Sequence, residues 1–183
     1  MTMICRWLLR VWGFRIVTAI PPDCKKSVVA VVPHTSNWDF PLGILTRNAM
    51  ETKIGFVAKD SLFKPLWGWF FTWTGGYPVD RSKKGSNYVE AIAAIFERVD
   101  GFHLSISPEG TRKKVDKLKT GFYYIAVAAK VPIILCKFDW EHREVTFREP
   151  FWPTGDVEKD MAFIYDYFRD VKGKVVENSF VPS

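Results

Sequence analysis

The stretch VVAVVPHTSNWD, residues 28–39, decides the fold because it predicts a strand, a sharp turn and the start of a helix in succession. Residues 28–32 are apolar and mostly β-branched, which is typical of a buried strand, and the run ends at a proline. The polar residues at positions 35–37 are all favourable at a helix N-cap, and apolar residues within 40–45 indicate a helical face behind them. The stretch therefore predicts a strand-to-helix corner with His34 at the turn.

The spacing of His34 and Asp39 suggests a catalytic pair. A turn between them would bring the carboxylate back onto the imidazole, five residues away. Such a carboxylate fixes the imidazole tautomer and leaves the other ring nitrogen free as a base. The alternative is an exposed histidine beside a helix N-terminus that an aspartate favours, and a short His-x4-Asp pattern does not by itself decide between the two.

Composition limits the class of partner. The 183 residues are enough for one domain with a sizeable core, and the net charge of +6 with a pI near 9.2 favours nucleic acid, phosphate substrates or an anionic lipid surface. Three widely spaced cysteines form no metal or disulfide pattern, which fits a reducing compartment. No Gly-rich phosphate loop or His/Cys cluster is visible, so we expect neither a metal site nor a cofactor.

Residues 3–18 form an apolar segment that carries Trp7, Trp12 and three arginines and is stopped by a Pro-Pro pair. The arginines argue against a membrane-spanning helix, and no cleavage site of a signal peptide is present. Two interpretations stay open: a short amphipathic helix at a membrane interface, or a helix packed on the domain's own core. We expect residues 1–22 to associate with the membrane and residues 23–183 to form the catalytic domain.

The rest of the chain alternates strand and helix patterns, which predicts a single α/β domain with a central sheet flanked by helices. The sheet is either parallel throughout or mixed near its C-terminal edge. The aromatic segment 62–73 has three possible roles: a core helix, an acyl-chain wall or a lipid-facing patch. The strands are expected at 54–58, 77–81, 101–107, 131–138 and 144–148, and the helices at 87–99, 121–130 and 156–171.

Two further strand ends carry polar residues like those at residues 34–39. They are YPVDR at residues 77–81 and SPEGTR at residues 107–112. In an open α/β sheet such ends converge on a crevice where ligands bind. From about Val28 to Phe138, the order and separation of these blocks, with a late VPI at 131–133, resemble the glycerolipid acyltransferases, the PlsC-like 1-acylglycerol-3-phosphate acyltransferases.

The resemblance implies a role for each matching residue. His34 would be the general base that deprotonates an acceptor hydroxyl, and Asp39 would orient it, so that the hydroxyl attacks the acyl carbonyl directly without a Ser or Cys nucleophile. Arg81 would contact the acceptor's phosphate, and Val131 and Pro132 would shape the acyl pocket. A second substrate-binding block would comprise Glu109, Gly110, Thr111 and Arg112. A guanidinium matches phosphate bidentately, whereas Glu109 would bond a glycerol hydroxyl or hold an arginine.

The resemblance further implies transfer of an acyl group from acyl-CoA or acyl-carrier protein to 1-acylglycerol 3-phosphate, which gives phosphatidate. We expect no cofactor, no nucleic acid, and a peripheral position on the cytoplasmic face of the inner membrane; the oligomeric state is open. Pro33 and Ser107 stand where the family often has Asn and Phe. These departures leave the acceptor open, so another lyso-lipid such as a lyso-aminolipid is an alternative. A basic protein that binds single-stranded nucleic acid is a second alternative from a different class.

Overall fold

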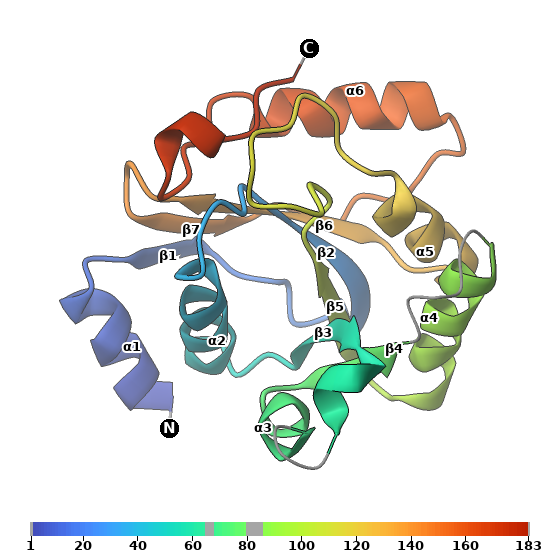
Figure 1. Cartoon of the computed structure of the whole chain (residues 1–183), viewed down its shortest axis with the longest axis horizontal. Helices are drawn as coiled ribbons and strands as arrows, with labels where there is room; N and C mark the ends of the chain where they lie inside the picture. Colours follow the sequence, from blue (N-terminus) through green and yellow to red (C-terminus); the bar gives the residue numbers. More distant parts are fainter. Residues whose placement is uncertain (1, 65–67, 80–85, 183) are drawn as a thin grey trace.

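The computed structural model describes residues 2–64, 68–79 and 86–182, which form an α/β domain around a mixed sheet (Figure 1). The described strands follow the order β1-β7-β6-β2-β5-β3-β4. This architecture confirms the expected fold class. The strands are β1 (Arg15–Thr18), β2 (Lys26–Val32), β3 (Ile54–Lys59), β4 (Gly76–Val79), β5 (Phe102–Ile106), β6 (Ile133–Asp139) and β7 (Glu144–Phe147).

Helices cover both faces of the sheet and enclose two apolar clusters. One cluster joins α1 and α2 to one face, and the other joins α4, α5 and α6 to the opposite face. The helices are α1 (Thr2–Val11), α2 (Asp39–Ala49), α3 (Gly68–Trp73), α4 (Ser86–Arg98), α5 (Gly121–Ala129) and α6 (Val157–Phe168), with short 3₁₀ turns η1 (Asp60–Phe63) and η2 (Val176–Asn178).

The strand directions place the candidate site at one edge of the sheet. β6, β2, β5, β3 and β4 run parallel, so their carboxyl ends share an edge. His34 follows β2 and Ser107 follows β5, and the two blocks therefore meet there. Only at the other margin does the direction change: β7 is antiparallel to β6, and β1 is parallel to β7.

The N-terminal helix is shorter than the segment 3–18, and this part of the prediction was wrong. The helix ends at Val11, and Gly13 follows with φ +83°. The Gly13 and Phe14 amides donate to the carbonyls of Arg10 and Leu9 at 2.9 and 2.8 Å, a Schellman ending that turns the chain away. The β-branched residues that follow then pair with β7 as the edge strand β1.

The structure supports the interpretation that the N-terminal helix packs on the domain, and it leaves the outer side of α1 exposed. Cys5 and Leu9 are buried in the cluster shared with α2, so the helix packs on the domain. Met3, Ile4 and Trp7 lie on its outer side and are exposed, Trp7 by 61%. Within the described residues, no helix has both the length and the hydropathy required to cross a membrane.

The aromatic segment 62–73 is not a core helix in its described part. Within α3 only Gly68 is buried, and Trp69 and Trp73 are each 68% exposed. Residue 67, a third tryptophan of the segment, lies outside the described residues. The core-helix interpretation is therefore wrong for α3, which presents two exposed indole rings.

Candidate active site

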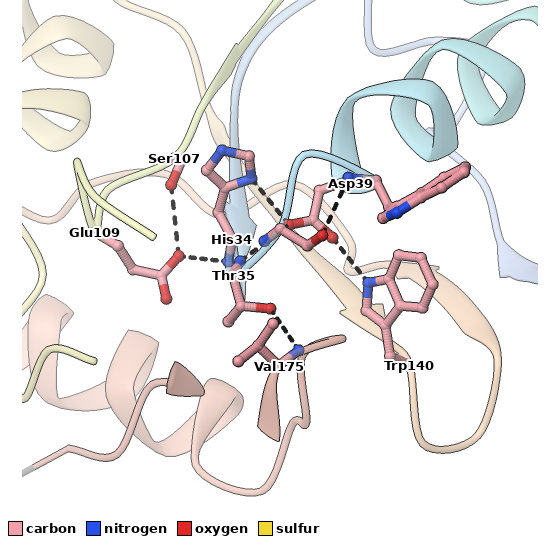
Figure 2. Close-up of polar contacts among 9 residues, drawn as sticks. His34, Thr35, Asp39, Ser107, Glu109, Trp140 and Val175 are labelled. Atoms are coloured by element: carbon pink, nitrogen blue, oxygen red, sulfur yellow. Dashed lines mark hydrogen bonds and ion pairs between the residues drawn. The ribbon is translucent and has the colours of Figure 1, made fainter. Parts of the chain in front are cut away.

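The corner after β2 brings His34 and Asp39 together as the spacing predicted. Nδ1 of His34 lies 3.1 Å from Oδ2 of Asp39 (Figure 2). The same oxygen accepts the backbone N–H groups of Thr35 at 2.9 Å and Ser36 at 2.8 Å, so the carboxylate closes the turn between strand and helix. Because Nδ1 faces the carboxylate, Nε2 is the ring nitrogen left for chemistry.

Asp39, rather than the polar residues before it, organises the start of α2. The helix begins at Asp39, its N-cap position is Trp38, and that cap has no side-chain hydrogen bond. The expectation that one of residues 35–37 caps the helix was therefore wrong. Thr35 is instead buried, and its Oγ1 accepts the backbone N–H of Val175 at 3.1 Å.

A tryptophan from a distant part of the chain completes the surroundings of Asp39. The Nε1–H of Trp140 donates to Oδ1 of Asp39 at 2.8 Å, and both side chains are buried (Figure 2). Trp140 lies in the turn between β6 and β7. No local pattern in the sequence marks this contact, because 101 residues separate the two partners.

Glu109 lies behind the corner that holds His34. Its Oε2 accepts the backbone N–H of His34 at 2.6 Å and lies 3.5 Å from the Ser107 hydroxyl, and the residue is 2% exposed (Figure 2). Its other oxygen, Oε1, has no hydrogen-bond partner within the described residues. Burial is the main reason that the pKa of Glu109 rises from 4.5 to about 7, against the lowering effect of the His34 amide.

The carboxylate of Glu109 thus supports the backbone of His34. Glu109 is not among the described residues that line the neighbouring cavity, so its geometry does not favour the expected bond to a glycerol hydroxyl. The arginine alternative also lacks support, since Glu109 forms no ion pair with an arginine of the described residues.

The rest of the third block faces the cavity. Gly110 has φ +65° and allows a sharp turn after Pro108, and a Cβ at this position would come within 2.5 Å of Nζ of Lys119. Thr111 and Arg112 follow on the cavity wall. Arg81, the other expected anion contact, lies outside the described residues.

A cavity of about 1100 Å³ adjoins His34 and Asp39. Its polar part includes Ser107, Arg112 and Lys119. Its apolar lining includes Phe40, Gly43 and Ile44 from α2, Val29 and Val31 from β2, Ile54, Phe56 and Val57 from β3, Cys136 and Phe138 from β6, and Phe122 and Ile125 from α5. Arg47 of α2 also lines the cavity, and its Nη1 donates to the Ile54 carbonyl at 2.7 Å. The lining can therefore accommodate an anion and a hydroxyl beside His34 and a hydrocarbon chain along the apolar side chains.

Val131 and Pro132 do not reach this cavity. They precede β6, which runs parallel to β2, so they lie at the opposite edge of the sheet from His34. Val131 is buried in the cluster on the face of α4, α5 and α6, and the Pro132 carbonyl accepts the Val28 amide at 3.0 Å. Neither is among the described lining residues, so the structure gives no support to their predicted place in the acyl pocket.

The structure gives no indication of a metal centre in the described part of the chain, where no three His, Cys, Asp or Glu side chains cluster. One other His–Asp pair occurs there: Nδ1 of His142 lies 2.8 Å from Oδ2 of Asp139. That pair is local to the β6–β7 turn, where His142 is exposed, and neither residue lines the cavity. The two His–Asp pairs contain the same chemical groups, but only the pair of His34 and Asp39 lines the cavity.

Comparison with known proteins places the chain near enzymes of lipid synthesis. A family model described as Acyltransferase matches residues 6–138. The 1-acyl-sn-glycerol-3-phosphate acyltransferases of Haemophilus influenzae and Escherichia coli are 26% and 30% identical, over 85% and 69% of this chain. The corresponding Salmonella typhimurium protein is 29% identical over 69% of the chain. The chain covers 67% of the Haemophilus protein and 54% of the other two.

Proposed function

The chain belongs to the PlsC-like acyltransferase family, and from this premise we propose that it acylates the free hydroxyl of 1-acylglycerol 3-phosphate to give phosphatidate. The donor is acyl-CoA or acyl-carrier protein. The observation that carries the proposal is the position of the His34–Asp39 pair, on the wall of a cavity that offers both basic and hydroxyl groups and many apolar side chains.

In the proposed reaction His34 is the general base. With Nδ1–H held by Asp39, Nε2 removes the proton of the acceptor hydroxyl as its oxygen attacks the thioester carbonyl carbon. The new C–O bond forms while the carbonyl electron pair moves onto oxygen. When the tetrahedral intermediate collapses, the C–S bond breaks and the leaving thiolate takes the proton from the imidazolium, which restores the base.

The lining of the cavity supports a substrate with an anionic head and an apolar chain. Gly110, Thr111 and Arg112 follow one strand end, and Lys119 lies beside Gly110. A guanidinium and backbone N–H groups suit a phosphate, and Arg81 would add a second fork. The acyl chain would lie along the apolar wall that α2 contributes. An acceptor with another anionic head would use the same contacts.

The activity test compares two histidines that each pair with an aspartate. We expect His34→Ala to lower kcat about 10²–10⁴-fold, the contribution of a positioned general base. His142→Ala is the matched control, because it breaks the exposed pair with Asp139 and should leave kcat unchanged. Purified protein is assayed with each donor against lyso-acceptors that differ in head group. A His34→Ala protein within a few-fold of wild type would refute the assignment of the base.

We also propose that the protein binds peripherally to the cytoplasmic face of the membrane that holds its acceptor. The outer side of α1 offers Met3, Ile4 and Trp7 beside the basic Arg10, and α3 offers two exposed tryptophans. Burial of a few such side chains, at about 1.5–3 kcal/mol each, together with attraction of basic residues to anionic lipid, suffices for reversible binding.

Substitution tests this surface better than truncation, because Leu9 and β1 belong to the folded domain. Sedimentation with vesicles of phosphatidylglycerol and phosphatidylcholine should show weaker binding for the double variant Ile4→Ser, Trp7→Ser. Trp152→Ser, which alters a 62% exposed tryptophan before α6, is the control. Equal binding by the double variant and wild type would exclude α1 as the contact.

A further inference from the structure

The two oxygens of Asp39 have different tasks. Oδ2 receives the Thr35 and Ser36 amides and faces Nδ1 of His34. Oδ1 receives the indole N–H of Trp140 at 2.8 Å. The residue is 3% exposed, so water does not compete freely for these positions. A hydrogen bond to an ionised carboxylate in such surroundings is stronger than one between neutral groups.

Trp140 is itself held in one orientation. Its backbone N–H donates to the Lys172 carbonyl at 2.9 Å, and its ring meets Phe14 edge to face with centroids 5.0 Å apart. Trp12 packs against the same ring at 5.7 Å, and the Lys174 ammonium lies 4.7 Å from its centroid. The indole N–H therefore points at Asp39 because two other segments of the chain, residues 12–14 and residues 172–174, fix the ring.

The contacts on Oδ2 do not by themselves fix the plane of the carboxylate. The donors on Oδ2 come from the turn that Asp39 closes, so the turn and the carboxylate can move together. The bond from Trp140 connects the carboxylate to the β6–β7 turn, which belongs to the sheet. It aims Oδ2 at Nδ1 of His34 and so holds the tautomer in which Nε2 keeps its lone pair for the acceptor.

We infer that Trp140 is a positioning residue for the His34–Asp39 pair, acting through its indole N–H rather than through packing alone. The inference rests on the proposed function for its consequence in catalysis. It assigns a role in the reaction to the residue that directly follows β6, whose carboxyl end shares an edge of the sheet with the carboxyl ends of β2 and β5. Loss of the donor should lower turnover without weakening substrate binding, since Trp140 does not line the cavity.

The test separates the donor from the ring. Trp140→Phe keeps an aromatic ring but removes the N–H, and we expect kcat to fall about 10–100-fold with both KM values unchanged, as for loss of one hydrogen bond to a charged group. Trp152→Phe is the matched control: it makes the same change at an exposed tryptophan that does not line the cavity and is not among the rings packed on Trp140. It should change kcat by less than about 2-fold.

A readout that does not depend on turnover accompanies the kinetics. Two-bond ¹H–¹⁵N NMR spectra resolve the ring nitrogens of the three histidines. Trp140→Phe should shift the Nδ1 and Nε2 signals of His34, because the tautomer is less firmly held, and Trp152→Phe should not. If the wild type fails to acylate any acceptor, the proposed function falls while this test still applies. Identical His34 signals in the two variants, or equal kcat values, would overturn the inference.

Discussion

Glu109→Gln should change how the stability of this protein depends on pH. Burial raises the pKa of the Glu109 carboxyl to about 7 in the folded protein, against 4.5 as its ordinary value. The protonated form is therefore the one that the fold favours. The corresponding stability is fully present below pH 4.5 and is lost as the pH rises to about 7 and beyond. At about 1.4 kcal/mol per pH unit, the loss amounts to about 3 kcal/mol by pH 8.

The variant removes this loss and keeps the contact with His34. The glutamine carbonyl can accept the His34 amide as the carboxylate does, and its NH₂ group takes the place of Oε1, which has no hydrogen-bond partner within the described residues. Relative to wild type, the free energy of unfolding of Glu109→Gln should therefore rise by about 3 kcal/mol between pH 4 and pH 8.

Urea unfolding at pH 4, 6 and 8, followed by tryptophan fluorescence, measures this difference. Other titrating groups are the same in both proteins, so their effects cancel in the comparison. Glu90→Gln, at an exposed position of α4, is the control and should unfold in parallel with wild type at every pH. If Glu109→Gln also runs parallel to wild type, the carboxyl is not held protonated by burial and the reasoning fails.

Three further predictions concern other contacts. Gly173→Ala should lower the free energy of unfolding, measured in urea, by about 1–3 kcal/mol, because its Cβ would come within 2.5 Å of Oγ1 of Thr35. Gly121→Ala, where nothing lies within 4 Å of the added Cβ, should not lower it. Equal losses in the two variants would contradict the clash. Burial lowers the pKa of His103 from 6.5 to about 4, so wild type should lose up to about 3 kcal/mol as the pH falls across that range. His103→Gln should not show this loss. If the free energy of unfolding falls equally in both proteins as the pH is lowered from 6.5 to 4, the prediction for His103 is refuted. Arg112→Ala should raise the acceptor KM and not the donor KM in steady-state kinetics, with partial recovery in Arg112→Lys; an effect on the donor alone would reverse the assignment.

The elements along most of the chain could be predicted because their signals are local. The apolar run of β2 and the helical spacing of α4 depend only on near neighbours, and both occur close to where the pattern predicts them. The contact between His34 and Asp39 belongs to the same class, since five residues and one turn are enough to form it. The alternation of strands and helices likewise indicated the central sheet and the meeting of strand ends at one edge.

Other features depend on which distant segments become neighbours, and only the tertiary structure decides them. β1 is a strand because β7 offers it an edge, which a short apolar segment cannot indicate. Val131 and Pro132 lie far from the site because β6 runs parallel to β2. The bond from Trp140 to Asp39 joins residues 101 positions apart, and the bond from Val175 to Thr35 joins residues 140 apart. Residue type and spacing in the sequence determine local geometry. Burial and long-range hydrogen bonds form only when the sheet brings segments that are distant in the sequence into contact.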